Sequence, residues 1–227
     1  MNIEMVIFDM AGTTINEDNI VYKTLQKAIN NFGIEVDLAG VLEIGAGQEK
    51  LNAIQDIITK YGNNADLDKA DAVFQSFLTM LATAYEEFAI QAMTNAESVL
   101  IELRNKNVLV ILNTGYDKNT ANFILEKINW RQFYHFDLLV TASDVKNSRP
   151  APDMIHFAMN LFSIDDPKKV VKVGDSRIDI EEGKNANCLF SIGVTTGAQT
   201  KTQLQDASPD YIIDDLTDLF DILKLNL

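Results

Sequence analysis

The sequence MVIFDMAGTT, residues 5–14, passes from a continuous apolar run into an aspartate and a turn that contains glycine. Its β-branched and aromatic side chains predict a strand that is buried on both faces, as in a parallel sheet. Open α/β sheets form their ligand sites where the strands end, so Asp9 lies where a reactive carboxylate would be useful. A lone aspartate here could equally cap a following helix, so its interpretation depends on the rest of the chain.

Three later segments carry groups that would complete a site around Asp9. An apolar run over residues 108–112 ends in NTGY, residues 113–116, which supplies a hydroxyl. The segment SRPAP, residues 148–152, places a cation in a loop stiffened by proline. The segment VVKVGDSRID, residues 170–179, ends another apolar run with two acids. In chain order the four segments supply a carboxylate, a hydroxyl, a cation and a pair of acids, which suits a site that handles a phosphoryl group.

The order of strand and helix patterns predicts the fold class. Helical patterns separate the strand patterns from about residue 95 onward. The strand patterns fall near residues 4–9, 108–113, 137–141, 170–174, 188–194 and 211–213. This alternation predicts an α/β fold with a Rossmann-like, mostly parallel sheet covered by helices on both faces.

Composition and charge exclude several classes of function. The 227 residues carry a formal net charge of −14 without a basic cluster, so most faces would repel a nucleic acid. No apolar run approaches the roughly 20 residues that cross a bilayer, and no signal segment precedes the first strand, so a cytoplasmic location is expected. The single cysteine, Cys188, cannot form an internal disulfide and is predicted to be a buried structural thiol.

The order and chemistry of the segments from Asp9 to Asp179 resemble the haloacid dehalogenase superfamily of aspartate-nucleophile hydrolases. Within it, DMAGT at residues 9–13, the later Thr-Gly-Tyr and the Arg-Pro-x-Pro run resemble the phosphonoacetaldehyde hydrolases, or phosphonatases, and phosphonatase-like relatives. Ordinary phosphatases of the superfamily carry a second aspartate two positions after the nucleophile. That position is Ala11 here, so their general acid is absent from its usual place.

The resemblance also implies how the chain is divided. Residues 16–92 break the strand–helix alternation with helical patterns over residues 19–32, 49–61 and 70–88. A block of helices after the first strand resembles the small helical cap of this superfamily. We therefore expect a cap at residues 16–92 and a catalytic core formed by residues 1–15 and 93–227. Linkers at 15–18 and 91–95 would let the cap close over the catalytic loops and expel water.

The resemblance assigns Asp9 as the nucleophile that forms an aspartyl-phosphate. It implies Mg²⁺ as cofactor, held by Asp9, the backbone carbonyl of Ala11 and Asp175, because Mg²⁺ prefers oxygen ligands. Asp179 would hold a metal-bound water or orient a neighbour. Without the resemblance, Asp175 and Asp179 could simply complement the charge of a helix N-terminus.

Further roles follow from the same resemblance. Thr114 should donate a hydrogen bond to a phosphoryl oxygen, although it could merely cap the next helix. Arg149 should supply positive charge in the transition state, although a surface ion pair is the alternative. The turn and loop residues beside these groups are expected to bind the substrate: Gly12, Thr13, Gly115 and Tyr116.

Lys50 decides whether the protein cleaves a carbon–phosphorus bond. A cap lysine of phosphonatases forms an imine with the substrate aldehyde, and GQEK at residues 47–50 resembles that cap motif. The chain departs from the family at Ala46 and Ala53, where phosphonatases have a methionine and a histidine. An imine-forming lysine must be neutral, so its pKa must be lowered by burial or by neighbours. The alternative is a solvated lysine on a helix.

The sequence therefore predicts a Mg²⁺-dependent, phosphonatase-like hydrolase that cleaves the carbon–phosphorus bond of phosphonoacetaldehyde or a similar small phosphonate. One alternative is a phosphatase-type hydrolase of another small phosphorylated metabolite, without an imine at Lys50. A second is a non-enzymatic phosphoacceptor or ligand-sensing module in which Asp9 turns over slowly. The expected partner is the small metabolite, with no nucleic acid and no membrane, and a homodimer is compatible with this assignment.

Overall fold

The main sheet of the protein has six parallel strands in the order β5-β4-β1-β6-β7-β8. We describe it from a computed structural model that covers residues 2–225, apart from the side chains of residues 64 and 65. The strands are β1 (Met5–Asp9), β4 (Leu109–Thr114), β5 (Leu138–Thr141), β6 (Val170–Gly174), β7 (Phe190–Val194) and β8 (Tyr211–Ile213). All six predicted strands are thus present and the α/β class is confirmed, but Cys188 lies before β7 and not within it.

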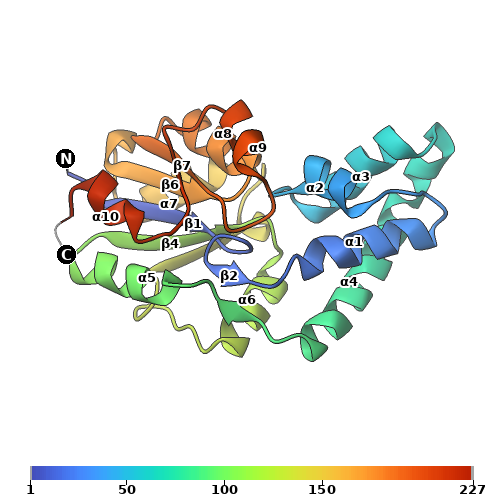
Figure 1. Cartoon of the computed structure of the whole chain (residues 1–227), viewed down its shortest axis with the longest axis horizontal. Helices are drawn as coiled ribbons and strands as arrows, with labels where there is room; N and C mark the ends of the chain where they lie inside the picture. Colours follow the sequence, from blue (N-terminus) through green and yellow to red (C-terminus); the bar gives the residue numbers. More distant parts are fainter. Residues whose placement is uncertain (1, 226–227) are drawn as a thin grey trace.

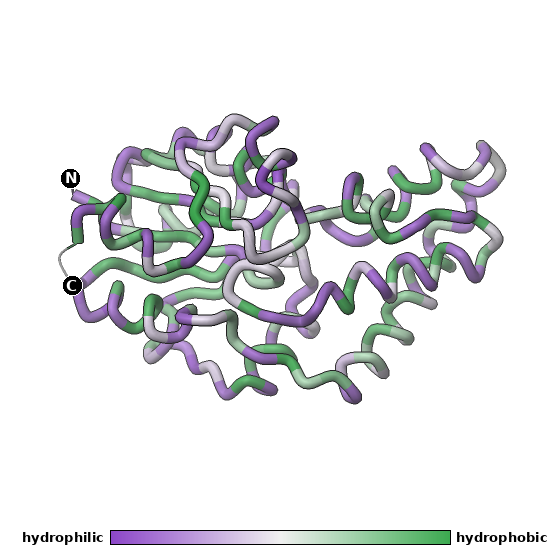
Figure 2. Tube along the Cα trace, viewed as in Figure 1, coloured by the Kyte–Doolittle hydropathy of each residue, from purple (hydrophilic) through white to green (hydrophobic). Residues whose placement is uncertain are grey.

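Helices cover both faces of this sheet (Figure 1). They are α5 (Ala96–Asn105), α6 (Lys118–Lys127), α7 (Asp153–Leu161), α8 (Arg177–Asn185), α9 (Lys201–Asp206) and α10 (Asp218–Leu223). Alternate residues of β1 enter different cores: Val6 and Phe8 pack in the cluster that contains α5 and α6, and Met5 and Ile7 pack with α7. Figure 2 shows the resulting apolar strands inside more polar surroundings. No helix within residues 2–225 is long and apolar enough to span a membrane.

Four helices lie together beyond one end of the sheet (Figure 1). They are α1 (Ile20–Asn31), α2 (Leu38–Gly45), α3 (Lys50–Tyr61) and α4 (Ala70–Glu87). Three of them match the predicted helical patterns. The additional helix α2 is short, and the carboxylate of Asp37 caps it by accepting from the Gly40 amide at 2.8 Å.

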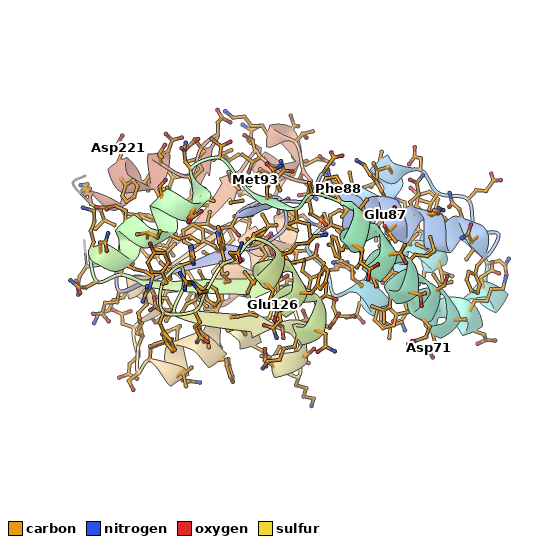
Figure 3. The ribbon with its side chains drawn as sticks, turned by 90° about the horizontal axis from the view of Figure 1, so that it is seen from below. Asp71, Glu87, Phe88, Met93, Glu126 and Asp221 are labelled. Atoms are coloured by element: carbon orange, nitrogen blue, oxygen red, sulfur yellow. The ribbon has the colours of Figure 1, made fainter. Side chains whose placement is uncertain are left out.

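Two short chain segments join the four helices to the rest of the protein. Strand β2 (Ile15–Asn16) precedes α1, and β3 (Gln91–Ala92) follows α4; the two pair in an antiparallel sheet of their own. Figure 3 shows Phe88 and Met93 on the segment that returns from α4 to the sheet. The paired segments bring both crossings of the chain to one place.

Parallel pairing brings the functional segments to one edge of the sheet. Asp9, the last residue of β1, is in register with Asn113 near the end of β4. Strand β6 pairs with the other side of β1 and ends at Gly174. The carboxyl ends of β1, β4 and β6 therefore meet at the edge that faces α2 and α3 (Figure 1).

Candidate active site

Three buried carboxylates gather at this edge. One oxygen each of Asp9, Asp175 and Asp179 lies within 4.8 Å of the others, and each residue is at most 4% exposed. Asp9 ends β1, Asp175 follows β6, and Asp179 lies in the first turn of α8. A Cβ at Gly12 or Gly197 would collide with the Asp175 carboxylate, so both glycines permit a close approach of the backbone.

Two buried cations hold part of this cluster. Arg149 Nη1 donates to Asp9 Oδ1 at 2.7 Å and also to Asp179 Oδ1. Lys172 Nζ donates to Asp179 Oδ1 at 2.8 Å. Arg149 is therefore a buried residue of the site, and the surface ion pair considered for it is wrong. Burial alone would raise the pKa of Asp179, but Lys172 and Arg149 together lower this pKa to about 2.

Asp175 has no comparable cation. Its Oδ2 accepts from the Ala198 amide at 2.5 Å, and none of the ion pairs within residues 2–225 includes it. Burial and the charges of Asp9 and Asp179 raise the pKa of Asp175 well above its usual value. A buried carboxylate is costly without positive charge, so the oxygen-rich cluster fits a divalent cation bound beside Asp9 and Asp175.

A polar network behind the carboxylates was missed by the sequence analysis. Lys172 lies in the interior of β6 with no exposed surface, and its Nζ donates to Asn113 Oδ1 at 3.0 Å. Asn113 Nδ2 in turn donates to Glu182 Oε1 at 2.8 Å, and Glu182 Oε2 lies 3.5 Å from Lys172 Nζ. The available signal was the lysine itself, because a charged residue inside a continuous apolar strand needs buried partners.

Two buried donors beside Asp9 have no partner among the described residues. They are the Thr13 hydroxyl and Arg149 Nε. The Thr114 oxygen accepts from the Tyr116 amide at 3.2 Å, which leaves the Thr114 proton free to be donated elsewhere. Helix α6 is capped instead by Asp117, so the capping alternative for Thr114 is wrong. Buried donors without acceptors are what a bound anion would satisfy.

The loop before α3 lies directly on the loops that follow β4 and β6. A Cβ at Gly47, which has φ of 76°, would come within 2.5 Å of Ser176 Oγ. A Cβ at Gly115 would come within 2.8 Å of the Gln48 carbonyl oxygen. The Gly47 amide also donates to the Tyr22 hydroxyl at 2.9 Å. These close approaches carry the start of α3 over the site.

Lys50 lies in this contact and not in solvent. It is 7% exposed, and its Nζ donates to the Gln48 carbonyl at 2.6 Å. Nζ is 5.4 Å from the ring centroid of Tyr22 and 5.5 Å from that of Tyr116. Burial and the charge of Arg149 lower the pKa of Lys50 to about 8. The alternative of a solvated lysine does not describe this side chain, while its role in an imine stays a prediction.

The space next to Lys50 is small. A cavity of about 20 Å³ adjoins Lys50 and Tyr116, and Phe77 and Leu81 of α4 close its other side. Ala46 and Ala53 are both buried within the helical block. A cavity of this size has room for about one water molecule, and Asp9 is not among the residues that line it.

A second buried carboxylate was not found from the sequence. Glu17 follows β2, is 2% exposed and accepts from the Tyr85 hydroxyl at 2.5 Å. The Tyr85 hydroxyl lies 2.9 Å from that of Tyr116, which adjoins Lys50. Burial raises the pKa of Glu17 to about 7. No local sequence pattern marks Glu17, because its partners come from distant segments.

Comparisons with known proteins agree with this geometry. The sequence model for haloacid dehalogenase-like hydrolases matches residues 6–193. A phosphonoacetaldehyde hydrolase of Latilactobacillus sakei is 31% identical over 94% of this chain and 82% of its own length. Pyrophosphatase PpaX of Oceanobacillus iheyensis is 23% identical over 98% of both chains.

A solved structure shares the whole fold. The phosphonoacetaldehyde hydrolase-like protein of Oleispira antarctica aligns with a TM-score of 0.84 and 21% identity, covering 99% of this chain and 92% of that one. At this identity the match demonstrates the fold alone.

Proposed function

The chain belongs to the haloacid dehalogenase-like hydrolases, and we propose that it is a phosphonatase that cleaves the carbon–phosphorus bond of phosphonoacetaldehyde or a similar small phosphonate. The observation that carries this proposal is the buried Lys50, which lies over the site with its pKa lowered to about 8. A substantial fraction of such an amine is neutral near pH 8 and can attack an aldehyde, whereas an ordinary lysine is almost fully charged.

We assign residues 1–15 and 93–227 to a catalytic core and residues 16–92 to a helical cap. The paired strands β2 and β3 form the hinge between them, because both crossings of the chain lie there. The contact of Gly47 with the loop at Ser176 corresponds to a closed cap. Closure would remove water from Asp9 and Lys50 and strengthen their electrostatic interactions.

In the proposed mechanism Asp9 attacks phosphorus and becomes an aspartyl-phosphate. Asp9, the Ala11 carbonyl and Asp175 would hold Mg²⁺, which supplies positive charge to mask the repulsion between the carboxylate and the phosphoryl dianion. The carboxylate of Asp175, buried and without a cation of its own, supports this assignment. Asp179 is already held by Lys172 and Arg149 and has the task of orienting Arg149.

The remaining groups bind the phosphoryl oxygens. Thr114 donates its hydroxyl proton, and Arg149 supplies charge in the transition state while it remains paired to Asp9. The free Thr13 hydroxyl and the backbone at Gly12 lie in the same turn as Asp9 and would complete the contacts. Gly115 lets the cap loop approach, and Tyr116 forms the wall beside Lys50.

Lys50 stabilises the carbon leaving group by forming an imine with the substrate. The neutral amine adds to the aldehyde and loses water to form a protonated imine. When Asp9 takes the phosphoryl group, the electrons of the carbon–phosphorus bond pass into the imine and form an enamine, which then takes a proton from water. The hydroxide that remains attacks phosphorus, breaks the bond to the Asp9 oxygen and releases inorganic phosphate. This route needs no general acid at position 11, where the chain has alanine.

A phosphatase-type activity is the second candidate. The pyrophosphatase relatives support it, because the chain covers 98% of the length of one of them. Ala11 disfavours it, because an alkoxide leaving group would have no acid to protonate it from that position.

Release of inorganic phosphate distinguishes the two candidates. The protein, supplied with Mg²⁺, would be assayed with phosphonoacetaldehyde, pyrophosphate and a panel of phosphomonoesters. We expect kcat/KM for phosphonoacetaldehyde to exceed that for each other compound by at least about 100-fold. Pyrophosphate or a phosphomonoester as the best substrate, with no turnover of the phosphonate, would overturn the proposal.

A further inference from the structure

Five buried side chains meet where the helical cap joins the core. We call them the junction cluster, and none is more than 7% exposed: Glu17, Tyr22, Lys50, Tyr85 and Tyr116. They come from the segment after β2, from α1, α3 and α4, and from the loop after β4. The phosphoryl chemistry at Asp9 does not use Glu17 or Tyr85, yet a buried carboxylate is expensive to keep without a purpose.

The hydroxyl groups of the cluster form a directed chain. The Tyr85 hydroxyl donates its only proton to Glu17 Oε2 at 2.5 Å. In the 2.9 Å contact between the two tyrosines, Tyr116 must therefore be the donor when Glu17 is ionised. The Tyr116 oxygen then keeps a lone pair for a proton arriving from the side of Lys50, which lies 5.5 Å from the Tyr116 ring.

We propose that Glu17 stores the proton of the Lys50 reaction and exchanges it with the substrate through the hydroxyls of Tyr85 and Tyr116. This inference rests on the proposed phosphonatase function. Glu17 does not itself reach the substrate, so it acts as a positioning residue for a proton that Tyr116 delivers.

The proton balance of this exchange closes over one turnover. Addition of the Lys50 amine to the aldehyde gives a neutral carbinolamine. Its hydroxyl leaves as water when Tyr116 gives it a proton, Tyr85 replaces that proton and Glu17 replaces the proton of Tyr85. The carbon–oxygen bond breaks, and the nitrogen lone pair forms the imine. After the phosphoryl group has left, water adds to the product imine, and the proton that it loses returns along the same chain to Glu17.

The electrostatics of the cluster suit this exchange. The groups that face Glu17 are Tyr22 from α1, Lys50 from α3, Tyr85 from α4 and Tyr116 from the core. Burial raises the pKa of Glu17 to about 7, even though the hydrogen bond from Tyr85 and the charge of Lys50 oppose this shift. An acid with a pKa near the working pH can both give and take a proton, which an ordinary carboxyl at pH 7 cannot.

Close packing against α2 accounts for the alanine at position 53. Ala53 has no exposed surface, and a Cβ at Gly45 of α2 would come within 3.3 Å of the Ala53 Cβ. A histidine at this position would have to displace α2. The chain instead brings its buried proton-carrying group from the hinge side of Lys50, at Glu17.

The test compares Glu17→Gln with Glu87→Gln, an exposed carboxylate two residues beyond Tyr85 (Figure 3). Glutamine keeps an oxygen that can accept from Tyr85 but cannot carry the proton. With phosphonoacetaldehyde, we expect Glu17→Gln to lower kcat about 100-fold with little change in KM. Because the reaction also needs neutral Lys50, with a pKa of about 8, kcat of the wild type should pass through a maximum between pH 7 and pH 8 and fall at higher pH, and this falling limb should vanish in Glu17→Gln. Glu87→Gln should match the wild type throughout.

Two readouts separate this inference from the proposed function. Borohydride reduction should trap the Lys50 adduct about 100-fold more slowly in Glu17→Gln, while phosphate release from acetyl phosphate at Asp9 stays unchanged. A wild type that neither cleaves the phosphonate nor forms the adduct overturns both proposals. If the wild type cleaves the phosphonate and Glu17→Gln has the same kcat and pH profile, this inference alone is overturned. If Glu17→Gln does not fold, Tyr85→Phe must show the same loss of kcat and of the pH limb, and an unchanged profile there is equally contradictory.

Discussion

The core cluster (Asp9, Arg149, Lys172, Asp175 and Asp179) and the junction cluster lie near each other but are built differently. The core cluster consists of carboxyl groups and cations in close contact, such as Arg149 and Asp9 at 2.7 Å, on segments that adjoin one sheet. The junction cluster consists mainly of hydroxyl groups, and burial moves the pKa values of its carboxyl and its amine toward neutrality.

This difference separates two tasks. Segments that adjoin a rigid sheet would hold in place the charged groups that phosphoryl transfer needs. In the junction cluster, burial moves the pKa values of Glu17 and Lys50 to about 7 and about 8, which would suit an exchange of protons with a substrate. Under the proposed function, the groups on the sheet would determine how phosphorus is attacked, and the junction cluster would determine which leaving group is accepted.

Removing the nucleophile should have the largest effect, on every substrate alike. Asp9→Asn cannot form the aspartyl-phosphate, so phosphate release should fall by at least about 10⁴-fold. The measurement is phosphate release from phosphonoacetaldehyde and from acetyl phosphate, with the exposed Asp71→Asn as control. Near-wild-type turnover by folded Asp9→Asn would show that Asp9 is not the nucleophile and that the chemistry does not depend on the core cluster.

Changing Lys50 should separate the two clusters. Guanidinium stays charged and cannot form an imine, so Lys50→Arg should reduce cleavage of phosphonoacetaldehyde by about 10³-fold or more. Turnover of acetyl phosphate, which needs only the core cluster, should change by less than about threefold. Lys60→Arg, an exposed lysine of the same helix, is the matched control. Equal losses on both substrates would contradict the division of tasks.

Loss of Asp175 should act through the metal. Asp175→Ala removes one of the three buried carboxylates, so Mg²⁺ should bind about 100-fold more weakly by calorimetric titration. Mn²⁺ should substitute for Mg²⁺ in the wild type, and Zn²⁺ should substitute poorly. The control is Asp221→Asn on α10, far from the site (Figure 3). Unchanged Mg²⁺ affinity, or full activity after chelation, would rule out the metal assignment.

The smallest effect concerns stability and tests the junction cluster without a substrate. The pKa of Glu17 is about 7 in the folded protein against 4.5 for an ordinary glutamate, so the folded state binds this proton more tightly. Its contribution to stability is complete below pH 4.5 and is lost as pH rises through 7. In urea unfolding experiments, the free energy of unfolding of Glu17→Gln should therefore increase relative to that of the wild type by on the order of 2 kcal/mol between pH 5 and pH 8. A constant difference would mean that Glu17 is ionised throughout.

The core cluster could largely be located from the sequence. Apolar runs that end in a polar residue mark strand ends, and parallel strands bring those ends together, so Asp9, Thr114 and Asp175 were expected near one another. Arg149 lies on a loop, and its placement beside Asp9 came from the family resemblance. The pattern does not locate Lys172, because an apolar run predicts the strand but not the buried partners of a lysine within it.

The junction cluster could not be located in the same way. Glu17 and Tyr85 are 68 residues apart in the chain, and neither stands in a motif. Their contact depends on how α4 returns to the core through the β2–β3 pair, which is too short to give a strand pattern. The helical pattern over residues 70–88 predicts α4 but does not show that Tyr85 of this helix carries a hydroxyl into the junction cluster.

The most direct test of the account is to trap the covalent intermediate. The protein would be mixed with phosphonoacetaldehyde, reduced with borohydride and digested, and the peptides would be analysed by mass spectrometry. The account predicts a reduced two-carbon or phosphonoethyl adduct on Lys50 of the wild type, and no adduct there in Lys50→Arg. A wild type that turns over phosphonoacetaldehyde while Lys50 remains unmodified would contradict the account.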